Sequence, residues 1–320
     1  MLRHPIIAGC AALALIAFAL PAAEAQTRTI RTIVPFGPGG ATDAVARVLA
    51  AHIERTQKVS TVIENRPGAG SIIATDAVAR MAGDGNTLLI VATSFLTNPM
   101  LRKVNYDPMA DFTPICHLVS TPAVITVSAS SPYKTLDDLI KAAKAQPGKL
   151  SLGTPGPGSS HHILFEGFKQ RAKVDITYVP FQATSKAISA ALGDHLTAVL
   201  SDYGSLAGPL ESGQLRALAV SSPERMKAMP DVPTLEEAGL PGLGLQSWFG
   251  IVAPAKLGGG IADELIGWYR AALADKDATA KLRALQLEPT PICGAEFETF
   301  LRTTGETFET IIKSANIKMK

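Results

Sequence analysis

The sequence has few cysteines, few aromatic residues and almost no net charge, and each shortage excludes a class of protein. Three cysteines in 320 residues are too few for the disulfide framework of a small secreted scaffold. A formal net charge of +2 with 6% aromatic residues gives no basic stripe of the kind that binds nucleic acid. The sequence has no Lys/Arg-rich amphipathic segment of the kind that binds a membrane surface. We therefore expect no nucleic-acid partner.

The chain also lacks a long hydrophobic run beyond its amino terminus. Arg3 precedes an apolar run from Ile6 to Leu20, and Ala23-Glu24-Ala25 follows. This is the three-part pattern of a secretory signal peptide, and its apolar run is shorter than the ~20 residues of a membrane span. Ile7-Ala8-Gly9-Cys10 resembles a lipoprotein cleavage box, but most of the apolar run follows Cys10. We predict a cleavable signal peptide over residues 1–25.

Two cysteines remain after the predicted cleavage, Cys116 and Cys293. They could pair in an oxidising compartment, although buried free thiols are the commoner state for cysteines of this kind. The sequence leaves their pairing open.

Apolar strands alternate with amphipathic helices along most of the chain. The first half has strands at 31–35, 59–64 and 87–92, with helices at 41–53 and 72–81 between them. This alternation indicates an α/β fold with mostly parallel sheets covered by helices. A second unit begins near Asp111, with strands that include 115–119 and 123–127, and the helices near 261–275 and 296–312 should return to the first. We predict two lobes with a ligand cleft between them: residues 26–110 and 225–320 form lobe 1, and residues 111–224 form lobe 2.

Two glycine-rich loops stand where chemistry is expected. The first is Phe36-Gly37-Pro38-Gly39-Gly40 and the second runs from Gly153 to Ser160. Each precedes a helix start, where unpaired N–H groups and the positive end of the helix dipole favour an anion. Two such loops, one from each lobe, could hold a carboxylate without an arginine, and neither contains Lys or Arg. The alternative is that both are ordinary strand-to-helix turns.

Other chemistry at these loops is less well supported by the residue pattern. Neither loop has a P-loop lysine or a dinucleotide-binding glycine pattern. His161 and His162 are adjacent and point about 100° apart on a helix, so they cannot chelate one metal ion together. Ser159 and His162 are the pair that an exported esterase would use, but no nucleophile-elbow motif surrounds Ser159. Asp43 could act as a general base, although a negative charge in a first helical turn needs no such role. We predict no enzyme activity, metal or cofactor.

The chain resembles the Bug/TctC receptors of tripartite tricarboxylate transport over essentially its whole mature length. The motifs that carry this resemblance follow one another in the family's order: Ile33 to Asp43, Glu64 to Gly70, Asp84-Gly85, Tyr106-Asp107-Pro108, Asp111 to Pro114, Pro147 to Leu150, Gly156 to Ser159 with His162, Leu215 to Val220, Pro233-Thr234, and Trp248 with Ala253-Pro254.

The resemblance implies a two-lobed, Venus-flytrap receptor in the periplasm of a Gram-negative bacterium. It would bind a small organic acid largely through backbone N–H groups and ordered waters. It would deliver that ligand as a monomer to the membrane subunits of a transporter or to a sensor. The residues expected to line the site are Phe36, Gly37, Pro38, Gly39, Gly40, Asp43, Thr93 and Ser94 from lobe 1, and Thr154, Gly156, Gly158, Ser159, Phe181, Gln182 and Asp202 from lobe 2. His162 is expected to support the second loop.

The sequence departs from the family's pattern after Val179-Pro180. A Tyr-Lys-Gly run is usual there, and this chain has Phe181-Gln182-Ala183. An apolar ring and an amide replace a hydroxyl and an ammonium, although Gln182 can still donate a hydrogen bond. We therefore expect a ligand whose distal end is less anionic than that of a tricarboxylate.

Overall fold

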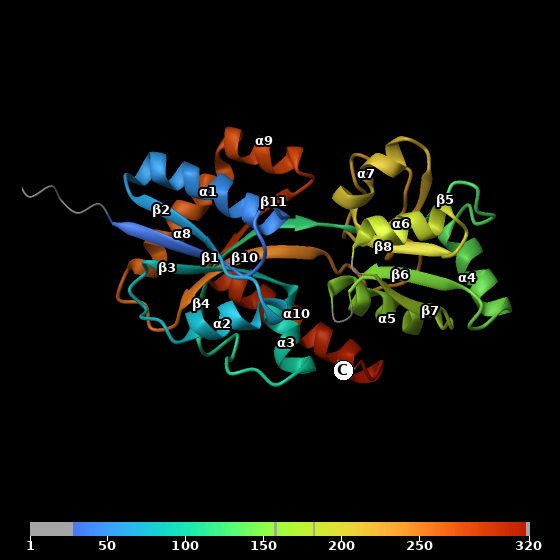
Figure 1. Ribbon diagram of the computed structural model, residues 1–320, viewed down its shortest axis with the longest axis horizontal. Helices are drawn as coiled ribbons and strands as arrows, with labels where there is room; N and C mark the ends of the chain where they lie inside the picture. Colours follow the sequence, from blue (N-terminus) through green and yellow to red (C-terminus); the bar gives the residue numbers. More distant parts are fainter. Residues whose placement is uncertain (1–27, 157–158, 182, 318–320) are drawn as a thin grey trace, which may run out of the picture.

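The computed structural model describes residues 28–156, 159–181 and 183–317 as two α/β lobes side by side (Figure 1). The predicted signal peptide and two predicted site residues, Gly158 and Gln182, lie outside these residues. Within the described part, no helix is long and apolar enough to cross a membrane.

Lobe 1 is built on a six-stranded mixed sheet in the order β11-β4-β10-β3-β1-β2. Its parallel strands are β1 (Thr29–Val34), β2 (Ser60–Asn65) and β3 (Thr87–Ala92), and its antiparallel pairings involve β4 (Phe112–Thr121), β10 (Ser247–Pro254) and β11 (Glu288–Cys293). The centre of the sheet is buried on both faces, which is why β3 is a continuous apolar run. The parallel strands β1, β2 and β3 have their carboxyl ends at the same edge of this sheet.

Two layers of helices cover the lobe 1 sheet (Figure 1). Residues of α1 (Ala41–Gln57), α8 (Ile261–Ala274) and α9 (Lys276–Ala284) pack in one hydrophobic cluster. Those of α2 (Ile72–Ala79), α3 (Thr93–Leu101) and α10 (Ala295–Ser314) pack in another. The carboxyl-terminal helices thus pack on the lobe 1 sheet.

Lobe 2 repeats this arrangement on a five-stranded sheet in the order β7-β6-β8-β5-β9. The strands are β5 (Ala123–Ser128), β6 (Ser151–Pro155), β7 (Thr177–Phe181), β8 (Ala198–Asp202) and β9 (Leu215–Val220), and β6, β7 and β8 are parallel. The helices α4 (Leu136–Ala145) and α5 (Ser160–Ala172) pack in one cluster, and α6 (Thr184–Leu192) and α7 (Tyr203–Glu211) in another. A capping box between Thr135 and Asp138 starts α4.

The sheets place the lobe boundaries later in the chain than the sequence indicated. The strand β4, predicted for lobe 2, pairs with β10 and β11 in lobe 1, so the chain crosses at Pro122 instead of near Asp111. It returns after Leu243, which lies in the lobe 2 core, and not at residue 225. The sequence of an apolar strand does not indicate which sheet the strand joins, and this explains why the predicted lobe boundaries differ from the observed ones.

Cys116 and Cys293 form a disulfide between β4 and β11. They are register partners on these neighbouring strands, and both are almost fully buried. The preference for free thiols was therefore wrong. It could not have been corrected from spacing, because the two cysteines are 177 residues apart in the chain.

The lobes touch each other at several places. Ser314 Oγ in α10 donates to Gln170 Oε1 in α5 over 3.0 Å, and Ile163 of α5 belongs to a lobe 1 hydrophobic cluster. At α7, a β-carbon on Gly204 would lie 3.2 Å from Gln286 Cβ of lobe 1. In Figure 1 the carboxyl end of β1 points toward lobe 2 and that of β6 toward lobe 1. The two glycine-rich loops therefore lie on the facing sides of the lobes.

Candidate functional site

The first glycine-rich loop is an exposed segment between two buried elements. Residues 37–40 are exposed, whereas Val34 and Pro35 before them and Thr42 and Asp43 after them are buried. Gly39 has φ +80°, a conformation that side chains disfavour, and a β-carbon there would meet no atom within 4 Å. The loop thus turns sharply and presents bare backbone.

Asp43 fixes this loop with both of its carboxylate oxygens. Oδ2 accepts hydrogen bonds from Gly39 N at 3.0 Å and Arg47 Nε at 2.9 Å, and Oδ1 accepts one from Asn65 Nδ2 at 2.9 Å. The bond from Arg47 is the main cause that lowers the pKa of Asp43 to about 2, against the opposing effect of burial. Asp43 is therefore an ionised support of the loop, and a proton-abstracting role does not fit it.

The first turn of α1 has open backbone donors. The N-cap residue, Gly40, offers no side-chain hydrogen bond to the helix. The amides of Ala41, Thr42 and Asp43 precede the first intrahelical bond, which runs from Ala44 N to Gly40 O. These amides can therefore donate to an external anion.

The end of β3 meets a strained segment that the sequence did not reveal. Ala69, Gly70 and Ser71 all have positive φ, and such strain tends to occur at functional sites. Ser94 Oγ lies 2.9 Å from Ser71 Oγ, and Asn98 Nδ2 donates to Gly70 O over 2.8 Å. The predicted residue Ser94 thus contacts this segment, and the predicted residue Thr93 is buried beside it at the start of α3.

The second glycine-rich loop is more internally bonded than the first. Ser159 Oγ caps α5 by accepting from His162 N at 3.2 Å, and it donates to Gly156 O at 2.9 Å. Gly156 N donates to Phe181 O over 2.9 Å, and Thr154 is fully buried. Tyr178 OH also donates to Gly156 O, at 3.1 Å. These hydrogen bonds fix the shape of the loop. The amide of Gly156 is already bonded to Phe181 O and is not open to a ligand.

His162 supports the second loop by stacking. Its ring lies 4.0 Å from the Tyr178 ring, with 9° between their planes. Burial, with a smaller effect of the Lys169 charge, lowers the pKa of His162 to about 4. The ring is therefore neutral near pH 7. Because Ser159 Oγ donates its proton to a backbone carbonyl, it is not arranged as a nucleophile beside this histidine.

Phe181 and Asp202, at the ends of β7 and β8, have different environments. A β-carbon at Gly153 would lie 2.7 Å from the Phe181 ring, so this ring packs over β6 and against the α6–α7 hydrophobic cluster. Asp202 Oδ1 lies 2.9 Å from His161 Nε2, and the Asp202 side chain is 29% exposed. Both residues were predicted to line the site. Asp202 has a polar side chain that is partly exposed, and Phe181 has an apolar one.

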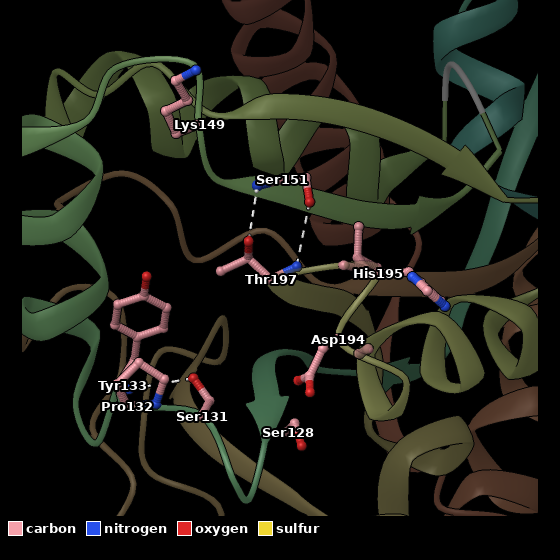
Figure 2. A pocket seen from close by; sticks show the side chains of 11 residues that line it. Ser128, Ser131, Pro132, Tyr133, Lys149, Ser151, Asp194, His195 and Thr197 are labelled. Carbon is pink, nitrogen blue, oxygen red and sulfur yellow. Dashed lines mark hydrogen bonds between the residues drawn. The ribbon is translucent and has the colours of Figure 1, made fainter.

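A pocket of about 330 Å³ in lobe 2 lies away from these loops (Figure 2). It is lined by Ser128 at the end of β5, Ser151 at the start of β6 and Thr197 just before β8. Ser151 and Thr197 exchange hydrogen bonds of 3.1 and 3.3 Å. This is the sheet edge opposite to Asp202 and the second loop, so the pocket is separate from the candidate site. Over the described ranges, no group of His, Cys, Asp and Glu could hold a metal ion.

Comparison with known proteins places the chain in one family. Residues 45–317 match the sequence model of a protein family, the tripartite tricarboxylate transporter family receptor. BugT of Bordetella pertussis is 35% identical over 230 residues, 71% of each chain. A Rhodopseudomonas palustris protein with adipate superposes with a TM-score of 0.78 at 31% identity, covering 92% of this chain and 99% of that one.

A second solved structure has a different ligand. MatC from Rhodopseudomonas palustris with bound malate gives a TM-score of 0.71 at 28% identity, covering 90% of this chain and 99% of that one. The family match spans most of the sequence, and the folds agree over nearly the full length of both solved chains. The chain therefore belongs to the tripartite tricarboxylate transporter receptor family and is a solute-binding protein of that family.

Proposed function

We propose that this receptor is exported to the periplasm through residues 1–25 and captures a small carboxylate between its two lobes. It acts as a monomer and delivers the ligand to the membrane subunits of a tripartite tricarboxylate transporter, or to a sensor. The adipate and malate bound in the two similar structures support the ligand class.

The observation that carries this proposal is the open first turn of α1. Its amides have no side-chain cap, and the one acidic group beside them, Asp43, is neutralised by Arg47. A ligand carboxylate placed there would gain several charge-assisted hydrogen bonds and the positive end of the helix dipole. No lysine or arginine needs to reach the ligand.

The second loop closes the site from lobe 2, and ordered waters complete the hydrogen bonds that the amides of the two loops leave open. Thr154 and Ser159 hold the second loop in place, and Ser94 contacts the segment of residues 69–71. Because Ser159 and Gly156 are hydrogen-bonded within the loop, they are better suited to lining the site than to catalysis. We accordingly propose binding without turnover.

Differential scanning fluorimetry against a panel of aliphatic mono- and dicarboxylates tests the proposal. Ligand binding should raise Tm by mass action. The variant Gly37→Val should abolish this shift, because a β-carbon at Gly37 meets nothing within 4 Å and the side chain would project from the exposed loop toward the ligand.

Gly259→Val is the matched control, since Gly259 lies in a glycine-rich loop before α8 and is equally open. It should keep the ligand-induced shift in Tm. A panel in which no carboxylate stabilises the wild type, or a Gly37→Val protein that keeps the full shift, would contradict the proposal.

A further inference from the structure

We infer that Asp202 sets the ligand class, by accepting a hydrogen bond from a hydroxyl or ammonium group at the end of the ligand remote from lobe 1. The inference rests on the proposed function and deepens it. The ligand would then be a monocarboxylate with a donor at its other end, such as an ω-hydroxy or ω-amino acid. A second carboxylate at that end would be disfavoured.

The position of Asp202 brings its side chain to the second glycine-rich loop. It is the last residue of β8, which is the parallel neighbour of β6, the strand that leads into this loop. Asp202 is also the N-cap residue of α7, yet its side chain makes no capping bond. Its carboxylate bonds instead to His161 in the first turn of α5.

His161 holds this carboxylate in one orientation. The His161 side chain is only 7% exposed, and its Nε2 lies 2.9 Å from Asp202 Oδ1. The other oxygen, Oδ2, has no hydrogen-bond partner among the described residues, and the side chain is 29% exposed. A fixed and partly exposed acceptor of this kind recognises a donor with little loss of side-chain entropy.

No lysine or arginine of the described chain lies within ion-pair distance of Asp202, whose partner is His161. This separates it from Asp43, which is paired with Arg47 and accepts two further hydrogen bonds. A ligand carboxylate at Asp202 would therefore face an acidic group that no lysine or arginine of the described residues offsets. Like charges brought together in a binding site oppose association strongly.

Isothermal titration calorimetry with matched ligands tests this inference on the full mature chain. One set is 6-hydroxyhexanoate, 6-aminohexanoate and adipate, and a shorter set is 4-hydroxybutyrate, 4-aminobutyrate and succinate. In the set that fits the site, we expect the hydroxy or amino acid to bind at least tenfold more tightly than the dicarboxylate. Asp202→Asn should reduce this ratio at least tenfold, chiefly by tightening the dicarboxylate.

Two further variants make the experiment specific. Asp194→Asn is the matched control, since Asp194 is an exposed acid of lobe 2 in the opposite pocket (Figure 2), and it should leave the ratio unchanged. Asp202→Ser removes the same charge with a smaller side chain, and it replaces Asp202→Asn if that variant does not fold.

Two results overturn the inference, and they are distinguishable. Dicarboxylates that bind at least as tightly as their hydroxy and amino partners, with a ratio that Asp202→Asn does not change, would remove Asp202 from ligand selection while leaving the receptor function intact. Failure of every carboxylate to bind would overturn the proposed function itself, and this inference with it.

Discussion

The two glycine-rich loops share one sequence pattern and differ in what they leave open. In lobe 1, Asp43 is neutralised by Arg47 and the first turn of α1 has no side-chain cap. In lobe 2, Ser159 caps α5, and among the described residues Asp202 is paired only with a histidine. The difference indicates that the lobe 1 side is suited to an anion and the lobe 2 side to a hydrogen-bond donor. A strand, a Gly/Pro loop and a helix are therefore not enough to define the charge of a site.

The largest expected effect concerns the disulfide, which only lobe 1 has, because the remaining cysteine of the chain is Cys10. Replacing Cys116 and Cys293 together by alanine should lower the free energy of unfolding by about 4 kcal/mol, as expected for a cross-link that closes a long loop. Chemical denaturation with amide hydrogen exchange would measure this. Protection should fall in lobe 1 and persist in lobe 2, and an equal loss in both lobes would mean that the lobes unfold as one unit.

The next effect concerns the two acidic side chains. Asp43→Asn should cost about 2 kcal/mol of stability, because an amide nitrogen cannot accept the bonds that a carboxylate oxygen accepts from Arg47, Gly39 or Asn65. Asp202→Asn, with one bonded oxygen, should cost less than about 1 kcal/mol. Urea unfolding of the two variants gives the comparison. Equal costs would show that the acids have equivalent surroundings.

A third effect is a pH dependence that both lobes share. Burial lowers the pKa of His117 in lobe 1 and of His162 in lobe 2 to about 4. The unfolded chain binds these protons near pH 6.5, so stability should fall as the pH drops from 6.5 toward 4, by on the order of 3 kcal/mol for each histidine.

Thermal unfolding between pH 7 and pH 4.5 measures this dependence. His162→Phe keeps an aromatic ring that can stack on Tyr178 and should make the decline of Tm with falling pH shallower. An identical decline in the variant would exclude His162 as a source of the acid sensitivity.

Much of the fold followed from hydrophobic periodicity, because buried parallel strands such as β3 are apolar without interruption. The membership of β4 did not follow, since pairing partners far apart in the chain decide it. The disulfide was missed for a related reason. Because β11 was not predicted, nothing in the sequence indicated that Cys293 lies on a strand beside Cys116.

The exposed turn before α1 was predictable, because glycines and a helix start define it at residues 36–40. The direction of side chains was not. Phe181 is predicted to line the site, and the residue pattern did not indicate that its ring packs over Gly153, which has no side chain to exclude it. Gly39→Val would be the obvious test from the sequence. Since Gly39 has φ +80°, that change would strain the loop itself, and Gly37 is the cleaner position.

Backbone amide NMR with a bound carboxylate tests the central claim most directly. On titration of the labelled protein with the tightest ligand found, the amide protons of Ala41 and Thr42 should shift downfield by more than those of Ala262 and Asp263 in the first turn of α8, which also lacks a side-chain cap. Saturating ligand that leaves the α1 amides unshifted, while resonances elsewhere in the protein respond, would show that the carboxylate does not bind at this helix start.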